Sequence, residues 1–537
     1  MSTTEKAGLP TEEKKVIFAS SLGTVFEWYD FYLYATLAPF FAALFFPPGN
    51  ETAALMSAFA TYAAGFLVRP FGAVVFGRIG DLVGRKYTFL VTIVFMGSAT
   101  FLVGLLPTFA SIGWAAPVLL VALRLVQGLA LGGEYGGAAT YVAEHAPHEK
   151  RGYDTSWIQT TATLGFFLAL AVIGGCRVWM DAKEFSDWGW RIPFWLSLVL
   201  LAFSVYIRLK LQESPVFQKM KAEGKGSKSP LTDSFFKYPN NKFVLLALLG
   251  ATAGQGVVWY TGQFYALFFL IITLKLDYVS AYTLIGVSLL IGTPFFIFFG
   301  WLSDKIGRLK IIMAGCLIAA LTYFPLFGGL THYVNPALED FSARTPITVA
   351  AEECTYHLFV GPWSKFTDCD RTKDFLTQKG LSFKSVHGEP GKSVVATIGA
   401  TRIEGWDSKA LDAALKDAGY KAGADKSQVN WVMAELILVI MVIYVTMVYG
   451  PIAAFLVELF PTRIRYTSMS LPYHIGNGWF GGMLPLTATA MVAATGDIYY
   501  GLWYPIVVAV MTLVIGTLFL TETKERDIRT YDHSMLP

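Results

Sequence analysis

Twelve long apolar runs divide the chain into two groups of six. Each run is long enough to form a helix of about 20 residues, the length that crosses a bilayer. The first group covers residues 16–46, 53–76, 87–107, 115–143, 156–175 and 191–211. The second covers residues 242–273, 279–300, 311–330, 428–458, 467–494 and 498–521. The pattern predicts an all-α membrane protein with twelve transmembrane helices in two six-helix halves.

Polar segments separate and flank the two halves. The first half spans residues 16–211, and a lysine-rich linker at 212–241 joins it to the second half, which comprises residues 242–330 and 428–521. Residues 331–427 form an insertion inside the second half, and residues 1–15 and 522–537 are tails. Basic residues concentrate in the tails and in the loops on the same side, so the positive-inside rule places both termini in the cytoplasm. The insertion is then expected on the periplasmic side.

An internal repeat relates the two halves. Four loop residues of the first half recur 223 positions later in the second half. The two sets are Gly77, Asp81, Gly84 and Arg85, and Gly300, Asp304, Gly307 and Arg308. Their glycines permit tight turns, while each aspartate is expected either to pair with the nearby arginine or to cap a helix N-terminus. Two parallel repeats around a central solute site are the expected design for alternating-access transport.

Composition excludes several other classes of protein. Hydrophobic residues make up 54% of the chain and charged residues only 15%, against roughly 25% charged residues in a soluble domain. A net charge of +3 is too small to indicate a nucleic-acid partner. The four cysteines lack the paired spacing of a metal site. No cofactor, metal or nucleic-acid partner is expected, and no nucleophile and base pair or nucleotide-binding loop indicates an enzyme.

The insertion is predicted to be a small folded α+β unit. Aromatic residues occur throughout it, which is atypical of disorder. The stretch 407–420 has helical spacing of apolar residues, and 347–350 and 393–398 resemble strands. Cys354 and Cys369 both lie here, in an oxidising compartment, and a disulfide closing about fifteen residues would stabilise the unit by about 3 kcal/mol. The alternative is that both thiols are free and that the insertion has no role in transport.

Several segments resemble the major facilitator superfamily. GRIGDLVGRK at 77–86 and GWLSDKIGR at 300–308 look like the loop signature of that superfamily, although Leu82 replaces the usual basic residue. Within RLVQG, Arg124, Gln127 and Gly128 match its fourth-span motif of symporters. More narrowly, FEWYDFYLY at 26–34, FLVRPFG at 66–72, QGLALGGEYGGA at 127–138 and WGWRIPF at 188–194 resemble the metabolite:proton symporter family. The resemblance implies the superfamily fold, proton coupling and a bacterial inner-membrane location.

Charged residues inside the first half are candidates for proton coupling, because ionisable groups in spans normally face the bundle interior or a wet pathway. Glu27 and Asp30 lie about one turn apart on the first span, with Tyr34 continuing that face. They either share a proton or form a fixed ion pair with a basic residue of a neighbouring span. On the fourth span, Arg124 and Glu134 are expected either to modulate the proton-bearing acids or to pair structurally.

Other residues are candidates to bind the solute or to gate the pathway. Arg69 either binds solute or extends its charge toward the inner interface. Gly128, Gly132 and Gly136 recur every fourth residue, which permits close helix contact, and we expect that contact to be a sliding gate between the halves. The remaining candidates for the solute site are Tyr34, Gln127, Gln255, Trp259, Gln263, Tyr473, His474 and Asn477.

The sequence therefore predicts a monomeric secondary transporter of the inner membrane. We expect proton-coupled symport of a small organic metabolite, with a carboxylate such as a dicarboxylate or α-ketoglutarate as the leading class. The proton-coupling set is Glu27, Asp30, Arg124 and Glu134. A symporter of a zwitterion such as proline or betaine is the first alternative. A membrane sensor with the insertion as its receptor is the second.

Overall fold

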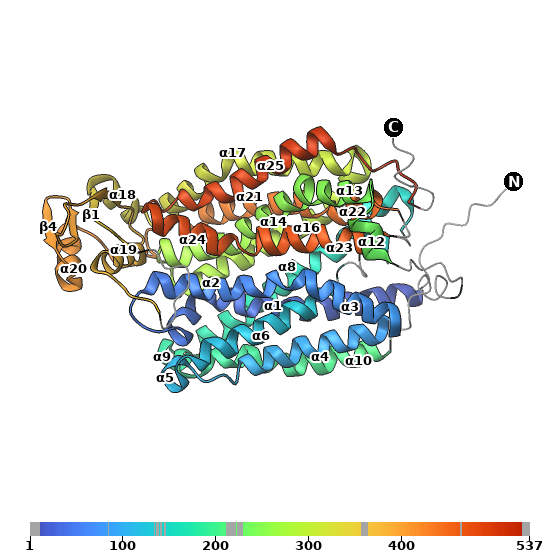
Figure 1. Cartoon of the computed structure of the whole chain (residues 1–537), viewed down its shortest axis with the longest axis horizontal. Coiled ribbons are helices and arrows are strands. Elements are labelled where there is room, and N and C mark those ends of the chain that lie inside the picture. The colour runs from blue at the N-terminus through green and yellow to red at the C-terminus, as the bar shows by residue number, and fades with distance from the viewer. Residues whose placement is uncertain are drawn as a thin grey trace.

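Two helical bundles lie side by side, and a small mixed domain projects from one end of them (Figure 1). In this computed structural model the described residues are 11–83, 85–133, 135, 139, 142–143, 146–210, 222, 229–355, 363–461 and 464–528. The start of helix α1 (Thr11–Phe45) and the end of helix α25 (Trp503–Phe519) lie at the end of the molecule opposite the mixed domain. We call these two ends the termini end and the insertion end. The bundles correspond to the two halves expected from the apolar runs.

The N-terminal half is built from helices that match the first six apolar runs. Its spanning helices are α1 (Thr11–Phe45), α2 (Glu51–Leu67) with α3 (Arg69–Val83), α4 (Arg85–Val103), α6 (Ala115–Leu131), α8 (Arg151–Trp179) and α10 (Ile192–Leu209). Short helices α5 (Phe109–Ile112) and α9 (Ala182–Asp187) lie in its loops at the insertion end. The second span is divided at Val68, directly before Arg69 and Pro70, because proline lacks the N–H needed for the helical ladder.

The C-terminal half repeats this arrangement with more irregular helices. After α12 (Pro230–Phe235), the seventh span runs from α13 (Asn240–Ala247) through α14 (Ala253–Tyr260) and α15 (Ala266–Phe268), with π-helical turns at Leu248–Thr252, Thr261–Tyr265 and Phe269–Thr273. The other spans are α16 (Tyr278–Ile306), α17 (Arg308–Val334), α21 (Trp431–Tyr449) with α22 (Ile452–Leu459), α23 (Arg465–Ile475) with α24 (Leu484–Thr495), and α25 (Trp503–Phe519). Such π turns are frequent at functional sites.

The membrane class and the two-half architecture are confirmed. Within the described residues, eight helical segments are long and apolar enough to cross a bilayer, and Leu90–Val103 and Ala115–Leu131 are shorter apolar helices. The remaining expected spans correspond to α1 and to α23 with α24, which is broken by a π turn at Gly476–Gly481. Individual ends differ from expectation, since α1 begins at Thr11 rather than residue 16 and α8 begins at Arg151 rather than residue 156.

The insertion is a mixed α+β unit, as predicted. It contains α18 (Pro336–Arg344), β1 (Ile347–Ala351), α19 (Asp368–Gln378), β2 (Lys384–His387), β3 (Val395–Ile398), β4 (Thr401–Glu404) and α20 (Ser408–Asp417). The strands form one sheet in the order β2-β1-β3-β4, with only the β1–β2 pair parallel. Asp407 caps α20 by accepting hydrogen bonds from Lys409 and Ala410. The predicted strand 347–350 and helix 407–420 correspond to β1 and α20.

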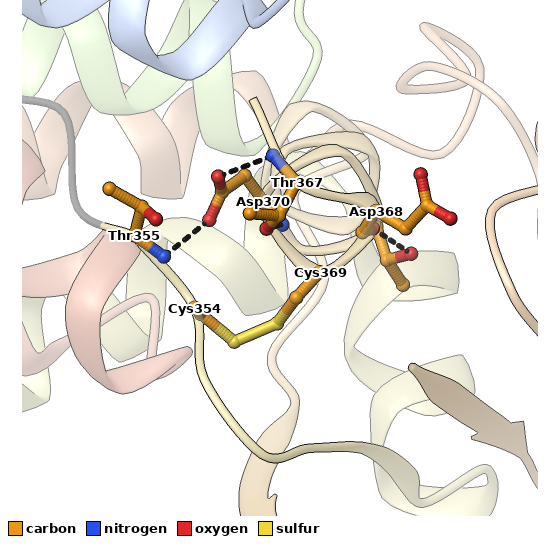
Figure 2. Close-up of a disulfide and its surroundings, with 7 residues drawn as sticks. Cys354, Thr355, Thr367, Asp368, Cys369 and Asp370 are labelled. Carbon is orange, nitrogen blue, oxygen red and sulfur yellow. Dashed lines mark hydrogen bonds between the residues drawn. A yellow bond between two sulfur atoms is a disulfide. The ribbon is translucent and has the colours of Figure 1, made fainter. Parts of the chain in front are cut away.

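A disulfide ties the loop after β1 to the start of α19. The structure bonds Cys354 to Cys369, and the Asp370 carboxylate beside them accepts hydrogen bonds from the backbone N–H of Thr355 (2.7 Å) and Thr367 (2.8 Å), as Figure 2 shows. The Thr367 hydroxyl oxygen in turn accepts a hydrogen bond from the Asp370 N–H, and the two bonds together form a capping box. The covalent and hydrogen-bonded links together fix the position of α19 within the insertion.

Close glycine contacts lie both within and between the halves. A Cβ on Gly128 would fall 1.8 Å from the carbonyl oxygen of Gly65, and one on Gly132 would fall 2.1 Å from that of Arg69. The α6 glycines therefore join α6 to α2 and α3 of the same half, so the expectation of a sliding gate between halves is wrong for them. Between the halves, Gly152 of α8 contacts Gly300 of α16, where a Cβ would fall 2.5 Å from the Gly300 carbonyl oxygen.

Candidate functional site

Arg124 is a buried clamp on the backbones of two neighbouring helices. Its Nη1 donates to the carbonyl oxygen of Phe31 (3.0 Å) and to Oε1 of Gln127 (3.2 Å), and Nε and Nη2 donate to the carbonyl oxygen of Tyr62 (3.3 Å each). Gln127 in turn donates to Thr100 of α4 (2.9 Å). Within the described residues no carboxylate pairs with Arg124. Its donors are occupied, so its geometry joins α6 to α1 and α2.

The two acids of the first span have different surroundings. Oε1 of Glu27 forms a 2.6 Å ion pair with Nη2 of Arg208 on α10, and both side chains are almost fully buried. Asp30 is also buried, and its Oδ1 accepts a 2.7 Å hydrogen bond from the Ser197 hydroxyl. Within the described residues Asp30 forms no ion pair. Glu27 thus has the fixed partner that the structural alternative requires, whereas Asp30 does not.

Arg69 is a buried cation with two unsatisfied donor nitrogens. Its guanidinium carbon lies 4.3 Å from the ring centre of Phe66, 4.4 Å from that of Phe31 and 5.3 Å from that of Trp28. The side chain is only 1% exposed, yet Nε and Nη2 have no hydrogen-bond partner and no described acid pairs with it. A buried charge without a partner is costly, so such a group requires an explanation. A bound anion would supply both the charge and the acceptors.

Further unsatisfied polar groups are buried on helices of both halves. Within the described residues, Tyr62 Oη, Trp259 Nε1, both ends of the Gln263 amide and both ring nitrogens of His474 are buried without hydrogen-bond partners. Aromatic rings connect them: Phe66 lies against Tyr260 (5.2 Å), and Tyr32 lies between Trp28 (5.2 Å) and Trp259 (5.7 Å). We call Tyr62, Arg69, Trp259, Gln263 and His474 the central polar cluster.

Other predicted solute ligands already have partners. Gln255 and Asn477 exchange two hydrogen bonds between their amides, at 3.0 and 2.9 Å. The Tyr473 hydroxyl bonds that of Tyr449 (2.7 Å), and its ring stacks on Tyr135 of the N-terminal half at 3.7 Å. Tyr34 donates to the carbonyl oxygen of Ala58. These side chains are held by partners within the protein.

A network of ion pairs joins the two halves at the termini end. Glu458, fully buried at the end of α22, accepts hydrogen bonds from Arg151 of α8 (2.8 Å) and Arg308 of α17 (3.0 Å). Arg308 also pairs with Asp304 (2.6 Å), whose carboxylate accepts hydrogen bonds from the Gly152 and Tyr153 N–H groups at the start of α8 (2.8 Å each). The second signature loop therefore holds the halves together. The residue pattern did not predict Arg151 and Glu458 as partners of this loop.

Some predicted residues lie outside the described part of the structure. Glu134 and Gly84 are among them. Gly77 and Asp81 fall in α3 and Arg85 begins α4, but the structure describes nothing of their side chains. In the second copy of the loop, Gly307 has a φ of +113° between α16 and α17, a conformation that favours glycine. Tyr62 was not predicted as a site residue. It lies one turn before Phe66 on α2 and seven positions before Arg69, the first residue of α3.

Comparison with known proteins places this architecture among secondary transporters. The chain matches the sugar (and other) transporter family over residues 15–234 and 417–534. It is 34% identical over 323 residues to the shikimate transporter of Escherichia coli K12, covering 59% of this chain and 72% of that protein. It is 35% identical to the proline/betaine transporter of the same organism, covering 58% of this chain and 64% of that protein.

Solved structures show the same fold at low sequence identity. A structure of the proton:xylose symporter XylE aligns over 96% of this chain and 97% of that chain, with a TM-score of 0.62 and 15% identity. The family match and the relatives identify the chain as a secondary transporter rather than an enzyme. The chain belongs to the major facilitator superfamily, and within it to the sugar (and other) transporter family.

Proposed function

We propose that this protein is a proton-coupled symporter that carries a small organic anion bearing a carboxylate. The observation that carries the proposal is Arg69, a buried cation with two unsatisfied donor nitrogens in the middle of the aromatic contacts between the halves. A guanidinium binds a carboxylate through two parallel hydrogen bonds. A solute carboxylate would therefore supply hydrogen-bond acceptors for these two donor nitrogens. The relatives, named for shikimate and for proline and betaine, favour no single solute.

The charge of the cluster favours a solute with one carboxylate. Arg124 is fully engaged with backbone carbonyls, and Arg208 pairs with Glu27, so Arg69 is the described cation near the cluster with free donors. A dicarboxylate would bury a second negative charge without a described partner. The proposed solute is therefore a monocarboxylate rather than the dicarboxylate expected from the sequence. Trp259, Tyr62 and Gln263 offer neutral hydrogen bonds, and the surrounding rings offer flat apolar contacts for the solute body.

A betaine-type solute is the second candidate, since aromatic rings bind quaternary ammonium groups. However, the guanidinium of Arg69 already occupies the faces of Phe31 and Phe66, so an ammonium group there would meet a like charge. The binding of betaine in preference to monocarboxylates would favour this alternative.

Asp30 is the leading site for the coupled proton. An acid buried without a described cation is more stable when protonated, whereas Glu27 has Arg208 as its ion-pair partner. In proteoliposomes, an inward proton gradient should drive solute accumulation and a protonophore should abolish it. Asp30→Asn should lose accumulation but retain exchange of solute for solute, because exchange needs no proton release. Asp187→Asn, at an exposed site, is the control. Undiminished accumulation by Asp30→Asn would reject Asp30 as the proton site.

We further propose that the protein lies in a bacterial inner membrane with its termini in the cytoplasm and its insertion in the periplasm. Thiol labelling of intact cells tests this topology. An impermeant reagent should label Cys354 and Cys369 only after reduction, because they form a disulfide. Cys176 and Cys316 are buried in helices and serve as internal controls that should stay unlabelled. Labelling before reduction would reject the disulfide in cells, and its absence after reduction would reject the orientation.

A further inference from the structure

The insertion belongs to the C-terminal half by sequence and by contact. It leaves from α17 and returns to α21. Its Phe383 N–H donates to the Gly496 carbonyl oxygen (2.8 Å), and Ser382 accepts from the Ile498 N–H (3.3 Å), both in the loop after α24. A Cβ on Gly380 would fall 2.1 Å from the carbonyl oxygen of Thr273 at the end of the seventh span. These contacts fix the insertion to the helix ends of its own half.

One helix of the insertion also reaches the N-terminal half. Helix α19 packs against the start of α2, as well as against α24 of its own half. The Asp374 carboxylate accepts hydrogen bonds from the backbone N–H groups of Glu51 (2.6 Å) and Thr52, and Gln378 donates to the Thr52 hydroxyl (3.5 Å). Phe366 lies against Gly49 just before α2. The insertion therefore bridges the two halves at the insertion end.

The chemistry of this bridge suits a reversible contact. The first N–H groups of a helix have no partner inside the helix, and they carry the positive end of its dipole, so an outside carboxylate satisfies them well. Asn50 caps only the Ala53 N–H, which leaves those of Glu51 and Thr52 to Asp374. Burial raises the pKa of Asp374 to about 6 although these donors act in the opposite direction, so the carboxylate is largely removed from water.

We propose that α19 is a latch that holds the insertion end closed and must leave α2 in each transport cycle. In alternating access the halves separate first at one end and then at the other. Arg151, Glu458 and Arg308 join the halves at the termini end, and Asp374 joins them at the insertion end. Because the latch moves with the C-terminal half, opening at the insertion end separates Asp374 from Glu51 and Thr52. The inference rests on the transport function proposed above.

A reversible crosslink tests whether the latch must open. In a Thr52→Cys/Gln378→Cys variant, a short bis-methanethiosulfonate should join α2 to α19 and reduce uptake at least tenfold, with recovery after reduction. The matched control is Ser382→Cys/Ile498→Cys, which joins the insertion to its own half and should leave uptake unchanged. Wild-type protein receives the same reagents. Full transport by the crosslinked Thr52/Gln378 pair, or failure of that pair to crosslink, would overturn the proposal.

A second measurement needs no solute and so separates a failed latch from a failed assignment of transport. Asp374→Ala should speed hydrogen exchange of the Glu51 and Thr52 amides at least tenfold, because these amides have no helical acceptor. Asp417→Ala, at an exposed site in the same domain, should leave it unchanged. Unchanged exchange in Asp374→Ala would show that Asp374 does not hold α2, whatever the protein carries.

Discussion

Arg69→Ala is expected to abolish solute binding and transport while leaving the protein folded. In the proposed complex the guanidinium is buried with the solute carboxylate, and removing one partner of a buried, hydrogen-bonded charge pair costs about 2–5 kcal/mol. That loss corresponds to binding weakened roughly 30- to 4,000-fold. Without solute, Arg69 has unsatisfied donors, so its removal should not destabilise the empty protein. Arg69→Lys should restore little binding, because an ammonium lacks the planar fork.

Solute-dependent thermal stabilisation measures this effect directly, since a ligand that binds only the folded protein raises its melting temperature, and a tighter ligand raises it more at the same concentration. A panel of monocarboxylates, dicarboxylates and betaine should shift the wild type most with a monocarboxylate, and should not shift Arg69→Ala. Arg177→Ala is the matched control, because Arg177 also lies over aromatic rings, 3.8 Å from the centre of Tyr278, but belongs to a different cluster. Equal stabilisation of Arg69→Ala and wild type would remove Arg69 from the solute site.

Glu458→Ala is expected to destabilise the protein strongly. The substitution leaves Arg151 and Arg308 buried with their shared carboxylate gone, and breaking a buried ion pair from one side costs about 3–5 kcal/mol. The apparent melting temperature in detergent should fall by roughly 5–10 °C. Transport should fall as well, since the network closes the termini end. Glu525→Ala, at an exposed position near the same end, should change neither.

A double-mutant cycle separates the ion pair from general damage. The double variant Arg151→Ala/Glu458→Ala should lose less stability than the two single variants lose together. The reason is that Arg151→Ala removes one of the charges that Glu458→Ala leaves uncompensated. Strict additivity would show that Arg151 and Glu458 do not interact in the purified protein. A melting temperature for Glu458→Ala equal to that of the wild type would contradict the network as a source of stability.

The arrangement of the spans was predictable because it depends on local properties. A run of about 20 apolar residues has few options other than crossing the bilayer as a helix. The 223-residue repeat marked the equivalent loops of the two halves. The acidic start and periodic apolar residues of 407–420 predicted a helix, which the structure has as α20. Helix α19 was missed, since its only apolar residues are Cys369, Phe375 and Leu376 and these form no continuous stripe.

The candidate site was predictable only as a set of residue types. Sequence spacing placed Glu27 and Asp30 on one face, but it could not assign Arg208 to Glu27 and leave Asp30 with Ser197. Arg124 looked like a partner for an acid, yet its five-donor group binds backbone carbonyls, which no side-chain pattern reports. The α6 glycines predicted close contact correctly but not the partner helix, because spacing describes one helix and not its neighbour.

The sequence by itself determined the membrane class, the two halves and the existence of a folded insertion. The length of each apolar run and the local periodicity are properties of consecutive residues, and the repeat is visible when the two halves of the sequence are compared. Tertiary structure alone decided which charges are paired. Arg151 meets Glu458 across 307 positions, and the Asp374 carboxylate meets the Glu51 N–H across 323. Arg69 forms no ion pair with a described acid, and two of its donor nitrogens are unsatisfied. Pairing of this kind depends on how helices from distant parts of the chain assemble, and it defines both the proposed solute site and the latch.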